Sequence, residues 1–186
     1  LLALGLYEYD YGTMGRAREF FNQAELIATE TADPRIICEV LIYNGYAALR
    51  QDDPFELLKK AEAALSVAQA FEYPKGRANA NFAIAYARVV VGDNQFALDS
   101  LKTAFEDFHP ESDWVEKAVN LNLRASIYTD LGRPDVARPM FVQAIGYYER
   151  SNNLRGRMHS LLAIGDIEFE GGNAGKAVEI YSEVIR

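Results

Sequence analysis

The sequence predicts an all-α fold in which about five antiparallel helix pairs follow one another as a helical-repeat solenoid. Two observations predict it. Small residues recur every 40 residues along the whole chain. Within each 40-residue unit, apolar residues follow the three-and-four spacing of amphipathic helices. Turn signals separate these segments, so the chain is expected to alternate between helices and short turns.

The expected repeats cover residues 1–31, 32–71, 72–111, 112–151 and 152–186, as a single array. Their structural repeat positions carry small side chains, namely Gly5, Gly45, Ala85, Ala125, Gly165, Ala17, Ala97, Ala137 and Ala177. Two helices joined by a short turn approach closely only where both lack bulk, so we expect these residues to lie between paired helices. The second repeat is degenerate, with Asp52, Leu57 and Ala61 at positions where other repeats have Gly, Ala and a large apolar residue.

Each pair of helices is separated by a turn of characteristic composition. The turns GTMG, RQDDP, VGDN, LGRP and EGGN combine a residue that tolerates left-handed geometry, usually Gly, with Asp, Asn or Pro at the start of the next helix. Pro34, Pro54, Pro74 and Pro134 each fit a first helical position, where a missing N–H costs nothing. Pro139 lies inside an expected helix, where it should remove one hydrogen bond or bend the helix.

Composition excludes several classes of function. Asp and Glu number 27 against 19 Lys and Arg, which argues against nucleic acid as a partner because phosphates demand clustered basic residues. No apolar stretch approaches the roughly 20 residues of a membrane span. The chain has one cysteine, Cys38, and two distant histidines, so we expect no disulfide, no metal site and no cofactor. No nucleophile, base and orienting residue can be assembled, so we expect no catalytic residues and no enzyme activity.

The repeated motif resembles the tetratricopeptide repeat, whose units carry a Leu-Gly pair, then Tyr, a Gly at the turn, Ala, an aromatic residue and Ala. The matches are Leu4, Gly5, Gly12, Ala17, Phe21 and Ala24, then Gly92, Ala97, Leu101 and Ala104, then Tyr128, Gly132, Ala137, Phe141 and Ala144, then Ile164, Gly165, Gly172, Ala177 and Tyr181. The period of 40 marks a long variant of a repeat that usually has about 34 residues. The resemblance implies a right-handed superhelix whose first helices line a concave groove.

By the same resemblance, inward-facing positions of the first helices form a partner-binding groove. The residues expected to line it are Glu39, Tyr46, Asn79, Phe82, Tyr86, Asn122, Asp130, Asp166 and Phe169. Carboxylates would steer a partner, aromatic rings would supply affinity, and the two asparagines would hold a peptide backbone. We therefore expect an acidic, aromatic-lined groove and a protein or peptide partner with basic and apolar residues. The alternative is structural: the aromatic rings pack between neighbouring first helices, and the acids are merely solvated.

Two functions remain open at this stage. The first is a non-catalytic scaffold module that binds a protein or peptide. The second is a sensory or regulatory domain of a larger, bacterial signalling or transcription-regulating protein, which binds a peptide or small ligand and controls an attached effector. The amphipathic ends lack polar caps, which predicts either flanking repeats or self-association of the chain. The single cysteine and the lack of a basic leader favour a cytoplasmic location.

Overall fold

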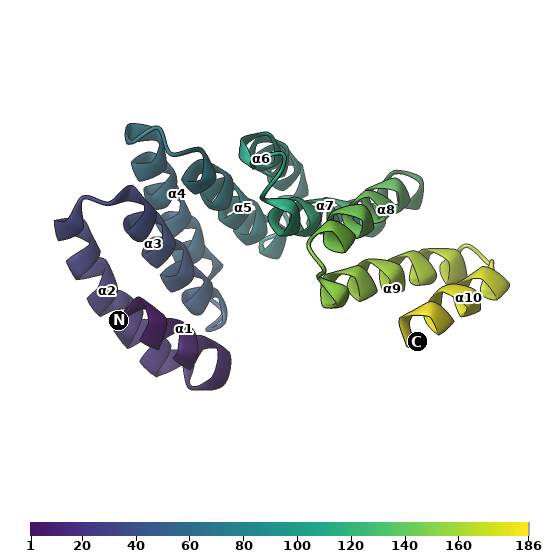
Figure 1. Ribbon diagram of the computed structural model, residues 1–186, viewed down its shortest axis with the longest axis horizontal. Coiled ribbons are helices and arrows are strands. Elements are labelled where there is room, and N and C mark those ends of the chain that lie inside the picture. Colours follow the sequence, from purple (N-terminus) through teal and green to yellow (C-terminus); the bar gives the residue numbers. More distant parts are fainter. Residues whose placement is uncertain (186) are drawn as a thin grey trace. The chain divides into compact units, whose positions relative to one another are not determined.

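The computed structural model describes residues 1–185, apart from the side chain of Ile185, and within that range the chain forms ten α-helices and no strand (Figure 1). The helices are α1 (Leu2–Tyr11), α2 (Met14–Thr31), α3 (Pro34–Leu49), α4 (Pro54–Ala70), α5 (Pro74–Val90), α6 (Asn94–Asp107), α7 (Trp114–Asp130), α8 (Pro134–Arg150), α9 (Leu154–Glu170) and α10 (Ala174–Ile185). The all-α prediction is confirmed. Of the expected last repeat, Arg186 lies outside the described residues.

The helices group into two compact units. Unit 1 covers Leu1–Phe108 and contains α1 to α6, and unit 2 covers His109–Arg186 and contains α7 to α10. Within each unit, every helix packs against the next one along the chain. In unit 1 the first helices of successive pairs also touch, because α3 contacts both α1 and α5. Unit 2 repeats this arrangement with α7 and α9.

Several helices begin at a capping side chain, although α5, α7 and α8 have no side-chain cap. From Pro34 onward each helix begins 20 residues after the previous one. Asp53 caps α4 by accepting a hydrogen bond from the Glu56 N–H at 3.0 Å, and Asn153 caps α9 by accepting one from Gly156 at 2.9 Å. Such a cap satisfies one of the four N–H groups that have no partner inside the helix, and it typically contributes about 1 kcal/mol.

The left-handed residues that follow the helices recur every 20 residues, except after α6. Left-handed backbone occurs at Ala32, Asp52, Glu72, Gly92, Gly132, Asn152 and Gly172. The sequence prediction of such a residue holds at the three glycines and at Asp52. It is wrong at Gly12, whose φ of −115° is not left-handed. The N–H of Gly12 instead bonds the Glu8 carbonyl, closing α1 without a left-handed residue.

The structural repeat positions lie where paired helices approach most closely, and all nine are buried. A Cβ on Gly45 of α3 would stand 2.8 Å from Leu57 Cδ1 and 3.2 Å from Leu57 Cα in α4. Both distances are shorter than ordinary van der Waals contact, so α3 and α4 fit together only because residue 45 has no side chain. In the degenerate second repeat, Leu57 thus fills the space that Gly45 leaves.

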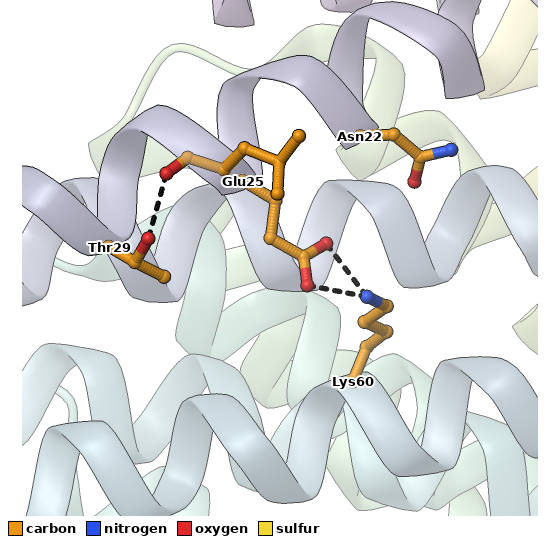
Figure 2. A pocket seen from close by; sticks show the side chains of 5 residues that line it. Asn22, Glu25, Thr29 and Lys60 are labelled. Atoms are coloured by element: carbon orange, nitrogen blue, oxygen red, sulfur yellow. Dashed lines mark hydrogen bonds and ion pairs between the residues drawn. The ribbon is translucent and has the colours of Figure 1, made fainter.

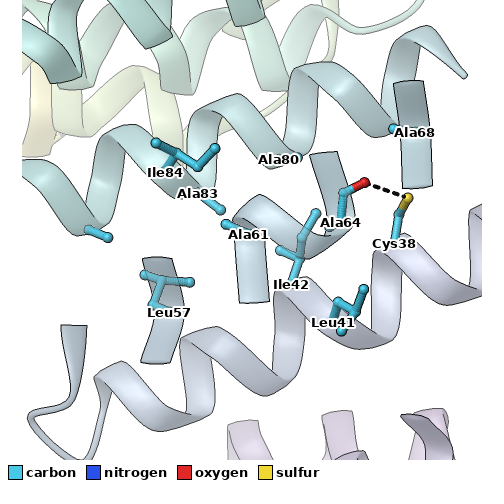
Figure 3. Packing of buried hydrophobic residues seen from close by; sticks show 11 residues of the cluster. Cys38, Leu41, Ile42, Leu57, Ala61, Ala64, Ala68, Ala80, Ala83 and Ile84 are labelled. Atoms are coloured by element: carbon cyan, nitrogen blue, oxygen red, sulfur yellow. Dashed lines mark hydrogen bonds between the residues drawn. The ribbon is translucent and has the colours of Figure 1, made fainter. Parts of the chain in front are cut away.

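Alanines form much of the core between the next helices of unit 1. Figure 3 shows Ala61 and Ala64 of α4 between side chains of α3 and α5, and both alanines are fully buried. Ile42 of α3 and Ala83 of α5 belong to the same cluster. Small residues here bring the helix backbones close, so a change of even one methylene group in side-chain volume should lower the stability of the fold.

A second kind of contact closes the turn inside four of the five helix pairs. The side chain of the residue five positions before the N-cap of the second helix bonds to that N-cap residue or stacks on it, but with different chemistry each time. Arg88 pairs with Asp93 at 3.4 Å, and Glu168 accepts a hydrogen bond from Asn173 at 2.9 Å. In the fourth pair, the guanidinium of Arg133 lies 5.9 Å from the centre of the Tyr128 ring. In the first pair Glu8 accepts a bond from the Thr13 N–H at 3.2 Å.

Helix α8 contains a proline in its interior. Pro139 lies inside α8, which nevertheless continues unbroken from Pro134 to Arg150. Its ring is exposed, so water can reach the carbonyl that loses its partner.

Within the described residues, none of the helices combines the length and the apolar character that crossing a membrane requires.

Two glycine substitutions test the close approach of α3 and α4. Gly45→Ala places a methyl group against Leu57 and should lower the free energy of unfolding by about 1–3 kcal/mol. Gly146→Ala is the matched control, because a Cβ there meets nothing within 4 Å and the alanine should raise helix stability by about 0.5–1 kcal/mol. Urea unfolding followed by circular dichroism measures both. Equal effects of the two substitutions would contradict the packing described.

Candidate functional site

Aromatic side chains gather on the first helices of unit 1. They are Tyr9 of α1, Tyr43 and Tyr46 of α3, and Phe82 and Tyr86 of α5, which we call the tyrosine face. The rings of Tyr46 and Tyr86 meet edge to face with centroids 6.1 Å apart, and the rings of Tyr86 and Phe82 lie 6.5 Å apart. These separations fall in the range of favourable aromatic pairs. The five rings therefore line a surface that runs over three consecutive first helices.

The tyrosine face is only partly covered. Tyr86 keeps 39% of its surface exposed, and the other four rings are partly buried. The Tyr43 ring also stacks on the fully buried Phe21 at a centroid distance of 6.3 Å, which anchors it to the core. Aromatic rings that are fixed by neighbours but open to solvent lose little conformational entropy when a ligand covers them.

Burial and nearby ionisable groups raise the pKa of two phenols of the face, Tyr43 and Tyr46. Burial raises the pKa of Tyr46 above its ordinary value, and the neighbouring phenols of Tyr86, Tyr9 and Tyr43 raise it further. Burial also raises the pKa of Tyr43, to which the carboxylates of Glu39 and Asp10 add. The phenols of Tyr43 and Tyr46 are thus neutral at neutral pH, and the side chains of Glu39 and Asp10 lie near Tyr43.

Arg50 closes one end of the tyrosine face. Its guanidinium carbon lies 4.6 Å from the centre of the Tyr9 ring, and its Nη1 donates a 2.7 Å hydrogen bond to the Tyr9 backbone carbonyl. For Tyr9, burial raises the pKa and outweighs the lowering effect of Arg50. Charges around the tyrosine face are mixed. Arg50, which directly follows α3, is basic, whereas Glu39 on α3 and Asp10 on α1 are acidic.

A shallow pocket of about 300 Å³ lies elsewhere in unit 1, between α2 and α4 (Figure 2). Asn22, Glu25, Leu26 and Thr29 of α2 and Lys60 of α4 line it. Lys60 Nζ donates to both carboxylate oxygens of Glu25, at 2.6 and 2.7 Å.

The buried Asn44 of α3 supports this ion pair by donating a hydrogen bond to Glu25. Only 1% of Asn44 is exposed, and its Nδ2 donates to Glu25 at 2.8 Å and to Asn22 at 2.9 Å. The polar groups of the pocket thus mainly bind one another, which ties α2, α3 and α4 together.

Comparison with known proteins places the fold. No family model and no curated protein sequence matches this chain. Among solved structures, a thermophilic TPR protein of Thermus thermophilus, TTC0263, aligns with 18% identity, covering 99% of this chain and 88% of that one, with a TM-score of 0.74. The TPR-like repeats of a putative kinesin light chain from Podosopora anserina align with 17% identity, coverages of 98% and 90%, and a TM-score of 0.70. The chain has the tetratricopeptide-repeat fold.

A third structure with a similar fold contains a bound partner. The Rap protein, complexed with Competence and Sporulation Factor, aligns with 21% identity and a TM-score of 0.83. The alignment covers 97% of this chain and 51% of the Rap chain, so this tetratricopeptide-repeat array spans about half of that protein. At these identities the likeness concerns the fold alone.

The structure brings together three of the five groove residues that the sequence predicts in unit 1. Tyr46, Phe82 and Tyr86 form one run of neighbouring rings, as described. Glu39 is exposed on α3 and close enough to Tyr43 to affect its pKa. Asn79 is half-buried on α5, one turn before Phe82.

The four predicted residues of unit 2 have different surroundings. Asn122 of α7 is engaged internally, since its Oδ1 accepts a 2.9 Å bond from Ser160 and its Nδ2 lies 3.3 Å from the Tyr148 hydroxyl. Asp166 accepts a 2.7 Å bond from Tyr181. Asp130 and Phe169 are exposed near the ends of their helices. The predicted carboxylates of this unit are thus at the surface, but its asparagine has a role in packing α7, α8 and α9.

Tyr9 and Arg50 also occupy positions that the repeat resemblance turns inward, so Tyr43 is the residue of the tyrosine face that the sequence prediction misses. Tyr43 could have been found, because it lies three residues before Tyr46 and therefore on the same side of α3. The contact of Arg50 with Tyr9 joins residues 41 positions apart, and only the position of Arg50 one repeat after Asp10 hints at it.

Cys38 lies in the core and does not belong to the tyrosine face. The thiol is buried, lies 3.3 Å from the Ala64 carbonyl, and has its pKa raised by burial to about 11. Among the residues that the structure describes, no three His, Cys, Asp or Glu side chains gather as metal ligands would.

The raised pKa of Cys38 gives a prediction for pH. The thiol stays protonated in the folded chain up to a higher pH than in the unfolded chain, whose thiol has an ordinary pKa of 9.0. Its contribution to stability is therefore intact below pH 9 and is lost as the pH rises from 9 to about 11. Urea unfolding of the wild type and of Cys38→Ala across this range measures the difference. A difference between the two proteins that does not change over this range would count against the burial described.

Proposed function

We propose that this chain is a non-catalytic module that binds a protein or peptide partner on the tyrosine face of unit 1. The observation that carries the proposal is the set of neighbouring aromatic rings that pack on one another and stay partly open to solvent. Large, rigid aromatic side chains dominate the energetics of protein interfaces because they bury much area at a small entropic cost. The tetratricopeptide-repeat fold supports it, since helical arrays offer extended binding surfaces.

The partner that we propose carries apolar residues together with basic ones. Apolar side chains suit the rings of Tyr46, Phe82 and Tyr86. Exposed carboxylates near these rings, Glu39 and Asp10, would attract a basic residue and set the register of the partner. The exposed Asp130, Asp166 and Phe169 give unit 2 a similar combination of charge and ring.

A regulatory domain is the second candidate. It is supported by the Rap alignment, because that protein has a similar array and was solved in complex with Competence and Sporulation Factor. In this role the present chain would bind a peptide or small ligand and control an attached effector domain. The sequence of the gene around this segment tests the idea: an adjoining catalytic or DNA-binding domain would favour it, and further repeats alone would oppose it.

The binding proposal can be tested with peptides selected by the whole chain. A displayed library of random peptides is selected on the wild type, and the affinity of the enriched peptides is measured by calorimetry. Tyr86→Ala should weaken them at least tenfold, because it removes the most exposed ring of the face. Phe55→Ala is the control, since Phe55 is 71% exposed but lies on the second helix α4. Peptides that bind Tyr86→Ala as tightly as the wild type would refute the proposed site.

A further inference from the structure

Helix α1 exposes apolar side chains at positions that other repeats bury. They belong to Ala3, Leu4 and Tyr7, which we call the N-face, and Tyr7 keeps 62% of its surface exposed. Two repeats later in the sequence, the positions of Leu4 and Tyr7 carry Ile84 and Ala87 of α5, and both of these residues are buried. The N-face therefore has the sequence position of a packing surface but not its burial.

Helices α9 and α10 expose a second set of apolar side chains. This set consists of Met158, Leu162 and Val178, which we call the C-face. Three repeats earlier, the positions of Met158 and Leu162 carry Cys38 and Ile42 of α3, which are buried. The position of Val178 carries Leu58 of α4, which is partly buried. The C-face too has the sequence position of a packing surface.

Inside unit 1 the counterparts of the two faces pack together. Cys38, Ile42 and Leu58, the counterparts of the C-face, belong to the same hydrophobic cluster as Ile84 and Ala87, the counterparts of the N-face (Figure 3). Helix α5 contacts both α3 and α4 at this cluster. The N-face and the C-face thus correspond to the two halves of an interface that the chain already forms in its interior.

We infer that the C-face of one copy of this chain binds the N-face of a second copy, so that α1 of the second copy packs on α9 and α10 as α5 packs on α3 and α4. A second copy is the occupant that these observations favour, because it brings the matching half of the interior interface. Exposed apolar side chains that lie together are typical of interaction surfaces. The contact goes beyond the proposed function, since it does not involve the tyrosine face.

The side chains of the two faces are larger than their interior counterparts. Tyr7 stands where α5 has Ala87, and Met158 stands where α3 has Cys38. We therefore expect the helices of the two copies to lie further apart than α3 and α5, with the larger side chains filling the added space. Those side chains also supply more apolar area than alanines would.

A contact between two different faces predicts a particular kind of assembly. Each pair of copies retains one free N-face and one free C-face, so further copies can add at either end and form an open chain. A contact of one face with itself would instead stop at two copies. The assembly should therefore grow with concentration beyond the dimer.

Sedimentation velocity of the whole chain, from about 1 to 500 µM, measures this association. The wild type should form species larger than dimers at the upper end of the range. Tyr7→Asp alters the N-face and Leu162→Asp alters the C-face, so each variant alone should associate at least tenfold more weakly. An equimolar mixture of the two should form a 1:1 dimer, because one intact face of each kind remains. Val142→Asp is the control, since Val142 is exposed on α8 outside both faces, and it should associate like the wild type.

Three results would overturn the inference. A wild type that stays monomeric over the whole range would leave the two faces to flanking repeats or to other partners. Dimers formed by Leu162→Asp alone would show that the N-face binds itself. Failure of the two folded variants to pair in the mixture would show that the faces do not bind each other. Circular dichroism establishes that each variant is folded, and Met158→Asp replaces Leu162→Asp if the latter is not.

Discussion

The close approach of paired helices is the constraint on which the rest of the structure depends. At Gly45 even a methyl group would press on Leu57 from the facing helix, and buried alanines of α4 and α5 form the next contact. Small residues contribute little hydrophobic area themselves, but they let buried large side chains such as Leu57 pack closely on the facing helix. This explains why size recurs at these positions from repeat to repeat, although the turn contacts of Arg88, Tyr128 and Glu168 differ in chemistry.

Because small residues form the contacts between helices, larger side chains can serve elsewhere. On the second helices, the ion pair between Glu25 and Lys60 links α2 with α4, and the buried Asn44 of α3 donates a hydrogen bond to Glu25. On the first helices of unit 1, large aromatic side chains line a face and keep part of their surface exposed. The small residues that bring paired helices together are thus distinct from the rings of the proposed binding surface, although those rings also pack against the core.

Much of the fold could be predicted from the sequence because its signals are local and repeated. The prolines at helix starts, the capping Asp53 and Asn153 and the recurring small residues each act within one helix pair. The left-handed Ala32 and Glu72 could not be predicted, since neither residue favours that backbone and the connection between pairs imposes it. Binding residues were harder to predict, because the exposure of a side chain depends on its tertiary neighbours. Asn122 carries the same amide as Asn79, yet its amide is hydrogen-bonded to Ser160 and Tyr148.

Native-state hydrogen exchange of the whole chain tests most directly whether contacts between small residues hold the array together. Helices α4 and α5, which contribute Ala61, Ala64, Ala80 and Ala83 to one buried cluster, should exchange their amides most slowly. Helix α1, with exposed Leu4 and Tyr7 on its surface, should exchange much faster. Slow exchange in α1 equal to that in α4 and α5 would contradict the account, because helix formation would then not depend on these contacts.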